Sequence, residues 1–398
     1  MTGNLLDKNE FWKMTAVNTH CHHLREPFFK EISLHKLLQM TYVSWIIRDP
    51  GDTDEGHQVY FSKMKANSYF YWWRRAVEDI YGDGRELTPE TWGWFDEKVR
   101  QAYTERQDQD IKLLKQRCKY SAVLLDDYED PGSDHGLPAL MRPVFRCDMF
   151  LCGYSYGKTD ENHNHAFDYF PARPDSIETY VAYTKSAITE AVQKGAVGLK
   201  IAIAYERSLE FVPGTYEKAK EAFGNESATD DQKKAFADYI MFKIAETAGQ
   251  MGIPVQIHTG LGALSGSRAI GLRDLIALNP DTKFDLFHAS YPWCDDVLGL
   301  AHNYPNVYVD LCWLPLISTS RSVHFLKEAL ELIESDRIIW GCDTWTGEES
   351  FGARMAVHQC MKEVFNSFIR DGVLSREDAL SEGRQILSDN AAKLYRLF

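Results

Sequence analysis

Short runs of apolar, β-favouring residues recur along the chain, and most of them end at or next to a polar residue. Several runs are almost wholly apolar, which is typical of strands in a parallel sheet that is buried on both faces. We therefore predict eight strands, at Met14–His20, Ser121–Asp126, Pro143–Asp148, Val197–Ile203, Pro254–His258, Phe284–His288, Val307–Leu311 and Ile338–Asp343.

Helical patterns lie between and after these runs. In Asp230–Gln250 the apolar residues Phe236, Ile240 and Ile244 recur at the spacing of one helix face. Eight strands joined by helical crossovers predict an α/β fold of the (β/α)8 TIM-barrel type, with an open doubly wound sheet as the alternative. Other helices are expected at Ser176–Lys194, Glu348–Asp371 and Ser375–Leu387.

One interval is much longer than a usual connection between a strand and a helix. Residues 24–118 separate the first two predicted strands and are rich in Tyr and Trp, including Trp72 and Trp73. We interpret this stretch as a helical, aromatic-rich insertion subdomain. The whole chain, residues 1–398, is then a single barrel domain that contains this insertion.

Composition narrows the class of protein. The net charge of −14 has the wrong sign for binding nucleic acid, and no run of 18 apolar residues predicts a membrane span. The eight cysteines are scattered without a CxxC pair, which favours reduced thiols in the cytoplasm. We expect a cytoplasmic enzyme with a small-molecule substrate, and whether it forms a homo-oligomer is left open.

Two histidines stand at the end of the first predicted strand with one residue between them. In extended backbone, residues i and i+2 point to the same side, so His20 and His22 can face the barrel interior while Cys21 points away. His23 has the wrong parity for this face. Two parallel imidazoles form half of a metal site, although such a pair by itself also occurs on ordinary surfaces.

Further metal-binding side chains end later strands. His258 ends the fifth predicted strand, His288 the sixth and Asp343 the eighth. The carboxyl ends of barrel strands meet at one rim, so these side chains can form one constellation with His20 and His22. The alternative is a set of buried histidines that hydrogen-bond to their neighbours.

Several stretches resemble the amidohydrolase superfamily of metal-dependent barrel enzymes, most closely the amidohydrolase-2 branch that includes aminocarboxymuconate-semialdehyde decarboxylase. From Val197 onward the chain is also similar to the barrel domain fused to some glutamine synthetase-like proteins. LLDDY at Leu124–Tyr128, PVFRCD at Pro143–Asp148 and the aromatic segment around Trp72 resemble uronate isomerases. The stretches that carry the superfamily resemblance are VNTHCHH, VGLKIAIAY, VQIHTGLG, FHASYPW, YPNVYVDL, IIWGCDTW and ILSDNAAKLYRLF.

The resemblance implies that His20, His22, His258 and Asp343 bind a divalent metal and that His288 lies beside the activated water. Imidazoles with one carboxylate suit Zn²⁺ and also accept Mn²⁺ or Fe²⁺. A metal of this kind lowers the pKa of a coordinated water to roughly 7. Asp343 is then the natural group to accept that water's proton, which makes Asp343 and His288 the candidate catalytic residues.

Other candidates are substrate-binding residues. Lys200 in the fourth strand has three interpretations: a carboxylated bridge between two metals, a partner for a substrate carboxylate, or a structural counter-ion. Arg146 and Arg207 can clamp an anionic substrate or form ordinary salt bridges. Trp313 and Trp345 follow the seventh and eighth strands and are candidates for the pocket wall.

These features predict a metal-dependent, amidohydrolase-type hydrolase acting on an amide, lactone or related carbonyl of a small acidic metabolite. The same site also accommodates a metal-dependent decarboxylase or a sugar-acid isomerase of the uronate isomerase type. A metal-binding scaffold without catalysis is the non-enzymatic alternative. Fold and metal chemistry do not determine the substrate.

Overall fold

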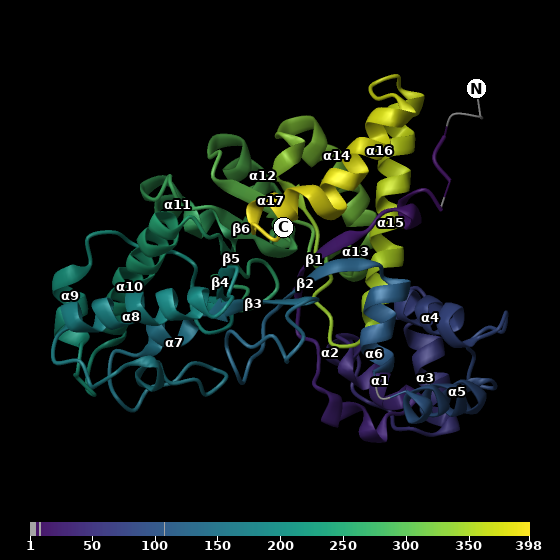
Figure 1. The fold of residues 1–398 in the computed structure, drawn as a ribbon, viewed down its shortest axis with the longest axis horizontal. Helices are drawn as coiled ribbons and strands as arrows, with labels where there is room; N and C mark the ends of the chain where they lie inside the picture. The colour runs from purple at the N-terminus through teal and green to yellow at the C-terminus, as the bar shows by residue number, and fades with distance from the viewer. Residues whose placement is uncertain (1–4, 8, 107) are drawn as a thin grey trace. The chain divides into compact units, whose positions relative to one another are not determined.

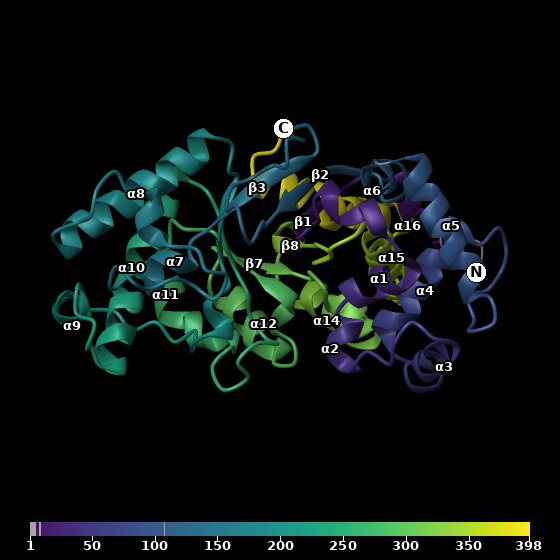
Figure 2. The same cartoon turned by 90° about the horizontal axis from the view of Figure 1, so that it is seen from below.

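The computed structural model describes residues 5–7, 9–106 and 108–398. Eight parallel strands form one sheet in chain order, β1 to β8, with helices between them (Figures 1 and 2). The predicted (β/α)8 barrel and all eight predicted strands are confirmed. The strands are β1 (Ala16–Cys21), β2 (Tyr120–Leu125), β3 (Met141–Arg146), β4 (Gly198–Ile201), β5 (Val255–Ile257), β6 (Phe284–Leu286), β7 (Val307–Asp310) and β8 (Ile338–Ile339).

Some strands end earlier than their apolar patterns indicate. β6 ends at Leu286 because His288 has φ 63°, in the left-handed region that a strand does not contain. β8 ends at Ile339, and Asp343, with φ 53°, also lies in left-handed backbone. His288 and Asp343 therefore lie on turns after their strands, and the local backbone conformation sets the direction of each side chain.

Contacts divide the chain into two compact units. The first comprises residues 1–123, 311–328 and 340–389, and the second comprises residues 124–310, 329–339 and 390–398. The first unit contains α1 (Leu34–Met40), α2 (Val43–Ile46), α3 (Asp54–Lys63), α4 (Ser68–Tyr81), α5 (Trp92–Glu105), α6 (Gln109–Lys112), α13 (Leu314–Ile317), most of α14 (Thr319–Leu332), α15 (Gly347–Arg370) and α16 (Arg376–Arg384). The second contains α7 (Asp148–Cys152), α8 (Ile177–Gln193), α9 (Tyr216–Ala222), α10 (Asp230–Met251), α11 (Arg273–Leu278), α12 (Cys294–Asn303) and α17 (Asn390–Leu394).

The long interval between β1 and β2 is helical and packs its aromatic residues together, as the sequence predicts. Asn67 caps α4 by accepting a hydrogen bond from the Phe70 amide. Phe70 and Trp73, three residues apart on one helix face, are both buried, with ring centroids 6.0 Å apart. Trp73 also lies near Trp92 of α5, at 6.4 Å between centroids. Aromatic packing thus supplies the core of the insertion.

Cap residues explain where the predicted crossover helices begin and end. Thr229 and Gln232 form a reciprocal capping box at the start of α10, and Gly252 ends it with φ 65°. Ser176 caps α8 by accepting from the Thr179 amide.

Within the described chain, no helix has both the length and the hydropathy needed to cross a bilayer.

Candidate metal centre

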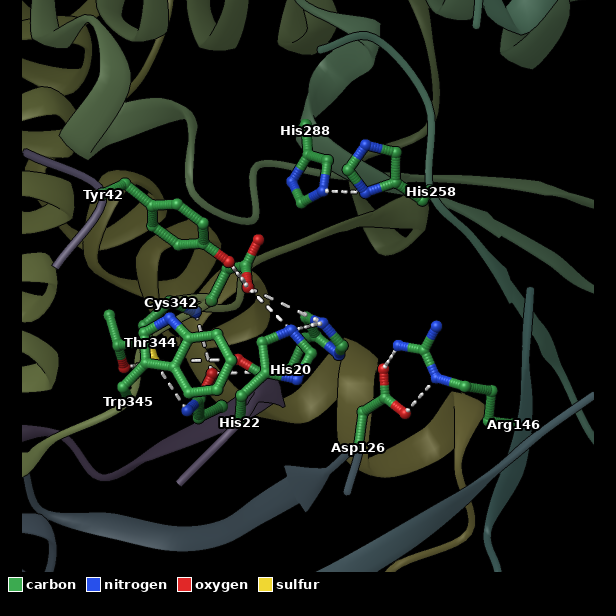
Figure 3. Close-up of polar contacts among 12 residues, drawn as sticks. His20, His22, Tyr42, Asp126, Arg146, His258, His288, Cys342, Thr344 and Trp345 are labelled. Carbon is green, nitrogen blue, oxygen red and sulfur yellow. Dashed lines mark hydrogen bonds and ion pairs between the residues drawn. The ribbon is translucent and has the colours of Figure 1, made fainter. Parts of the chain in front are cut away.

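His20, in β1, and His22, directly after that strand, lie together in the first unit (Figure 3), and Asp343 lies beside both of them. The Nε2 atoms of His20 and His22 are 3.2 Å apart. One carboxylate oxygen of Asp343, Oδ1, is 3.2 Å from His22 Nε2 and 3.8 Å from His20 Nε2. All three side chains are buried. The two imidazoles, one at the end of β1 and one directly after it, therefore lie on the same side of the chain, as the i, i+2 spacing predicts.

The spacing and chemistry of these atoms fit a metal ion. Two ligands of a tetrahedral ion bound at 2.0–2.1 Å lie about 3.4 Å apart, and the three distances of 3.2, 3.2 and 3.8 Å lie close to this value. Neutral imidazole nitrogens and a carboxylate oxygen are ligands that Zn²⁺ and related ions prefer. This cluster can therefore supply three ligands from a buried position.

Backbone contacts hold Asp343 beside β1. The Asp343 amide donates to the His20 carbonyl at 2.9 Å. The side chain of Asn18 accepts from the Cys342 amide at 2.8 Å and donates to the Cys342 thiol at 2.7 Å. The positive φ of Asp343 costs on the order of 1–3 kcal/mol for a non-glycine residue, and such strain is often found at functional sites.

Aromatic side chains surround this cluster. The Tyr42 hydroxyl donates to Asp343 Oδ1 at 3.2 Å, and the Tyr42 ring lies 4.5 Å from the Trp313 ring. The Trp345 ring is 5.0 Å from the imidazole of His22. Of the two predicted wall residues, Trp345 therefore lies against the ligand His22, and Trp313 packs on Tyr42. Contact of either residue with a substrate remains a prediction.

His258 and His288 form a buried pair in the second unit (Figure 3). His258 Nε2 is 2.5 Å from the Leu261 carbonyl, which can only accept a hydrogen bond. His258 therefore carries its hydrogen on Nε2 and presents a lone pair on Nδ1. That Nδ1 atom lies 3.1 Å from His288 Nε2. A neutral Nδ1 lone pair held in this way is suited to binding either a metal ion or a donated hydrogen.

An unusual backbone run positions His288. Three consecutive residues, His288, Ala289 and Ser290, have φ of 63°, 47° and 52°. Each such residue costs energy unless the surroundings impose the conformation. The Ser290 hydroxyl supports the run by accepting from the Ala269 amide at 3.1 Å. Because of this strained turn, the backbone at His288 no longer follows the direction of β6.

Arg146 is enclosed by carboxylates in the second unit. Its Nε donates to Asp126 Oδ1 at 3.1 Å and its Nη2 also pairs with Asp126 (Figure 3). Its Nη1 donates to Asp148 Oδ2 at 3.0 Å. Burial raises the pKa of Asp148 to about 7, while the positive charge of Arg146 opposes that rise. Both carboxylates therefore engage the guanidinium that we predicted to clamp an anion.

The other two predicted cations have different surroundings. Lys200 is buried, and its Nζ lies 3.9 Å from the centre of the Phe287 ring. Lys200 also stands in register with Arg146 on β3 and Gln256 on β5. Arg207 pairs with Asp238 at 2.6 Å and lines a pocket of about 460 Å³.

Comparison with known proteins places this geometry in a family. Residues 165–397 match the family described as Amidohydrolase. The chain belongs to the amidohydrolase family. Protein fluG of Emericella nidulans is 35% identical to it over 150 residues, which are 36% of this chain. This amidohydrolase covers only 17% of the length of that protein.

Solved structures share the whole fold at low sequence identity. A proposed metal-dependent hydrolase from Lactobacillus casei superposes with a TM-score of 0.73 at 17% identity, over 99% of this chain and 98% of its own. A uronate isomerase from Thermotoga maritima gives a TM-score of 0.75 at 16% identity, over 98% and 96% of the two chains. The similarity supports the barrel, and the chemistry of this amidohydrolase must come from its own residues.

The structure also identifies residues that the sequence patterns did not single out for this site. Asn18 lies two residues before His20, so the alternation that pairs His20 with His22 also places Asn18 on that face. Tyr42 lies among the many aromatics of the insertion, where packing was the simplest interpretation. Asp126 ends the second predicted strand, and its position there was the available signal for a partner of Arg146.

Proposed function

We propose that this amidohydrolase is a metal-dependent hydrolase of an amide, lactone or related carbonyl in a small acidic metabolite. The observation that carries the proposal is the buried cluster of His20, His22 and Asp343, whose donor atoms have the spacing of metal ligands. Membership of the amidohydrolase family supports the same chemistry.

We propose that His20, His22, His258 and Asp343 hold the ion, with Zn²⁺ preferred and Mn²⁺ or Fe²⁺ as alternatives. The Leu261 carbonyl supports this role for His258 because it fixes the hydrogen on Nε2. The lone pair of Nδ1 is then available to coordinate a metal ion. When bound, such an ion polarises a carbonyl and lowers the pKa of a water molecule.

The protein groups then divide the remaining tasks. Asp343 accepts the proton of the attacking water and returns it to the leaving group. Tyr42 keeps the Asp343 carboxylate in place through its hydrogen bond. His288 donates from its imidazole to the carbonyl oxygen as negative charge develops there. Trp313 and Trp345 limit the entry of bulk water around the ligands.

We propose that the substrate is anionic and that Arg207 and Lys200 contact it more directly than Arg146. The pocket beside Arg207 is lined by more basic than acidic side chains, even though several of them form local ion pairs. Arg146 is occupied by Asp126 and Asp148 and is better placed to organise this part of the barrel than to bind an anion. The basic side chains lining the pocket are Arg207, Lys158, Lys233 and Lys234, and the acidic ones are Glu206 and Asp230.

Isomerisation of a sugar acid is a second candidate, and one observation favours it. Two of the three stretches that resemble uronate isomerases meet in the second unit, where Asp126 of LLDDY pairs with Arg146 of PVFRCD. Tyr128 of the first stretch lies under the same guanidinium, 4.8 Å from its carbon to the ring centre. In this candidate function the ionic arrangement would hold this part of the barrel in shape around a hydroxyl-rich acid, and other groups would bind the acid itself.

A substrate screen, run with and without bound metal, distinguishes these functions. The purified chain is assayed with amides, lactones, uronates and hydroxybenzoates, before and after treatment with a chelator. We expect chelator-sensitive hydrolysis of an acidic amide or lactone. Isomerised uronate without hydrolysis supports the second candidate, and release of CO₂ from a hydroxybenzoate indicates a decarboxylase. Full activity after complete removal of the metal contradicts the metal-dependent scheme.

We also propose a cytoplasmic location. None of the eight cysteines forms a disulfide in the structure, and seven of them are buried. Thiols that are not joined in disulfides, in this number, suit a reducing compartment. Fractionation of the native cells, with detection by antibody, tests this assignment.

A further inference from the structure

A second cluster of histidine and aspartate side chains lies in the helical insertion. His35 belongs to α1, His57 belongs to α3, and Asp49 and Asp52 lie on the loop between α2 and α3. Candidate ligand atoms of His35, Asp52 and His57 all lie within 4.8 Å of one another. None of these residues belongs to the centre described above. We propose that this cluster is a second site for a divalent transition-metal ion of the Zn²⁺ class.

The distances within the cluster fit such an ion. His57 Nε2 is 2.9 Å from Asp52 Oδ1, and His35 Nδ1 is 3.9 Å from the same oxygen. These values lie on either side of the spacing of about 3.4 Å between two ligands of a tetrahedral Zn²⁺ ion. Two imidazoles and one carboxylate leave a coordination position for water.

The hydrogen bonding of His35 points to a ligand on its Nδ1 atom. Its Nε2 lies 3.3 Å from Asp49 Oδ2, and a carboxylate can only accept, so this nitrogen carries the hydrogen. In the neutral ring, Nδ1 then presents a lone pair toward Asp52, and this buried atom has no hydrogen-bond partner. A cation between His35 Nδ1 and Asp52 Oδ1 would attract both atoms, and it would replace the hydrogen that His57 Nε2 shares with this oxygen at 2.9 Å. A carboxylate that orients the far nitrogen of a ligating imidazole is a common arrangement around bound metals.

The surrounding chain holds the four side chains in place. The Gly51 amide and the Tyr60 hydroxyl donate to Asp49 Oδ1, at 2.8 and 3.3 Å. Gly56 packs so closely against the Gly51 carbonyl that a Cβ atom would lie 2.1 Å from that oxygen. This close approach lets the loop reach the first turn of α3, and the imidazole of His57 is fixed by stacking on Trp92 at 4.2 Å.

The site is open to solvent on the carboxylate side. The side chain of Asp52 is 47% exposed, whereas that of His57 is 7% exposed. An ion can therefore enter from the surface and bind to imidazoles that are already ordered. A bound ion would fasten the 49–52 loop to both α1 and α3, so we assign it a structural role.

Cobalt binding to the full chain tests the proposal. The double variant His20→Asn/His22→Asn removes the catalytic centre and is loaded with Co²⁺, which reports its ligands by visible absorption. We expect it to retain about one ion per chain with the spectrum of a low-coordinate nitrogen–oxygen site. Adding Asp52→Asn should weaken Co²⁺ binding at least 10-fold, whereas the control Asp54→Asn in the same acidic stretch should leave it unchanged.

Several outcomes overturn the proposal. A folded double variant that binds no Co²⁺, or equal binding by the Asp52→Asn and Asp54→Asn variants, contradicts the second metal site. If the double variant does not fold, metal analysis of the otherwise unaltered chain decides: Asp52→Asn should remove one ion, and an unchanged count contradicts the site. An extra ion held by a carboxylated Lys200 would not respond to Asp52→Asn. Failure of the hydrolase proposal leaves this result intact, because the double variant already lacks that centre.

Discussion

His22 and His23 are adjacent in the sequence, yet their imidazoles have different partners. His22 lies 3.2 Å from both His20 and Asp343, whereas His23 Nδ1 lies 3.3 Å from Asp110 and its Nε2 lies 3.4 Å from the Ser350 hydroxyl. The change of direction at each residue of a strand separates the two roles. This pair therefore offers a matched test of the metal centre.

We predict that His22→Asn removes one metal ion per chain and that His23→Asn retains it. Even partners of metal ligands typically contribute 10- to 100-fold to affinity, so loss of a ligand should weaken binding at least as much. His23→Asn should instead lower the melting temperature, because the buried carboxylate of Asp110 loses the imidazole that lies 3.3 Å from it. Metal analysis and thermal unfolding of both variants provide the check. Equal metal loss in the two variants would show that the parity argument is wrong.

Tyr42 acts on the centre through one hydrogen bond. We predict that Tyr42→Phe keeps the metal ion and the fold but lowers kcat about 10-fold, because a hydrogen bond to a charged group contributes roughly 1.5–3 kcal/mol. The retained ring still packs on Trp313. Steady-state kinetics with metal analysis measures the effect. An unchanged kcat would mean that the hydroxyl has no part in holding Asp343 for the reaction.

At the scale of elements, Gly341 allows the segment after β8 to pack closely against β1. A Cβ atom at this position would lie 2.4 Å from the Thr19 hydroxyl and 2.9 Å from the His20 amide. We predict that Gly341→Ala destabilises the chain and lowers its metal content, because β1 must shift. Gly299→Ala in α12 is the control, since its Cβ meets no atom within 4 Å and alanine favours a helix by about 0.5–1 kcal/mol. A Gly341→Ala protein as stable as the control would contradict the close approach.

The first turn of α15 buries an acid whose ionisation opposes folding. Burial and the nearby charge of Asp110 raise the pKa of Glu348 to about 7, although hydrogen bonds from Tyr81 and Tyr103 oppose the rise. Because the folded pKa lies above the unfolded value, this group stabilises the fold fully at low pH. That contribution is lost as the pH rises from about 4.5 through 7.

Glu348→Gln should therefore raise the melting temperature more at pH 8 than at pH 5. The difference in unfolding free energy is on the order of 3 kcal/mol, because each tenfold change in the proton-binding equilibrium corresponds to about 1.4 kcal/mol. Thermal unfolding at several pH values measures it. Glu363→Gln, at an exposed position of the same helix, should show no such dependence. A stabilisation by Glu348→Gln that is equal at both pH values would contradict the raised pKa.

At the scale of the whole molecule, the net charge of −14 repels the acidic substrate that we propose. Salt shortens the range of this repulsion, to about 8 Å at physiological ionic strength. We predict that raising the salt concentration from about 20 to 200 mM increases kcat/KM for an anionic substrate about 2- to 5-fold. The neutral amide of the same acid serves as the control. A decrease with salt would show that local groups such as Arg207 dominate the approach.

Much of this architecture could be predicted because it depends on local patterns. Apolar runs mark buried strands wherever they pack, so all eight strands were found. Capping residues act over three or four positions, so the start and end of α10 at Thr229 and Gly252 could also be expected. The facing imidazoles of His20 and His22 follow from side-chain alternation along a single strand.

Other features depend on residues that meet only after folding. Tyr42 and Asp343 are 301 positions apart, and no local pattern selects this tyrosine from the other aromatics of the insertion. The sequence identified Arg146 but not the enclosure of its guanidinium by Asp126 and Asp148. The left-handed backbone at His288 and Asp343 could not be predicted from the sequence either, because non-glycine residues adopt it only when packing compensates for the strain. The sequence determines which residue types lie on each strand face, while long-range packing decides which of their atoms come within bonding distance.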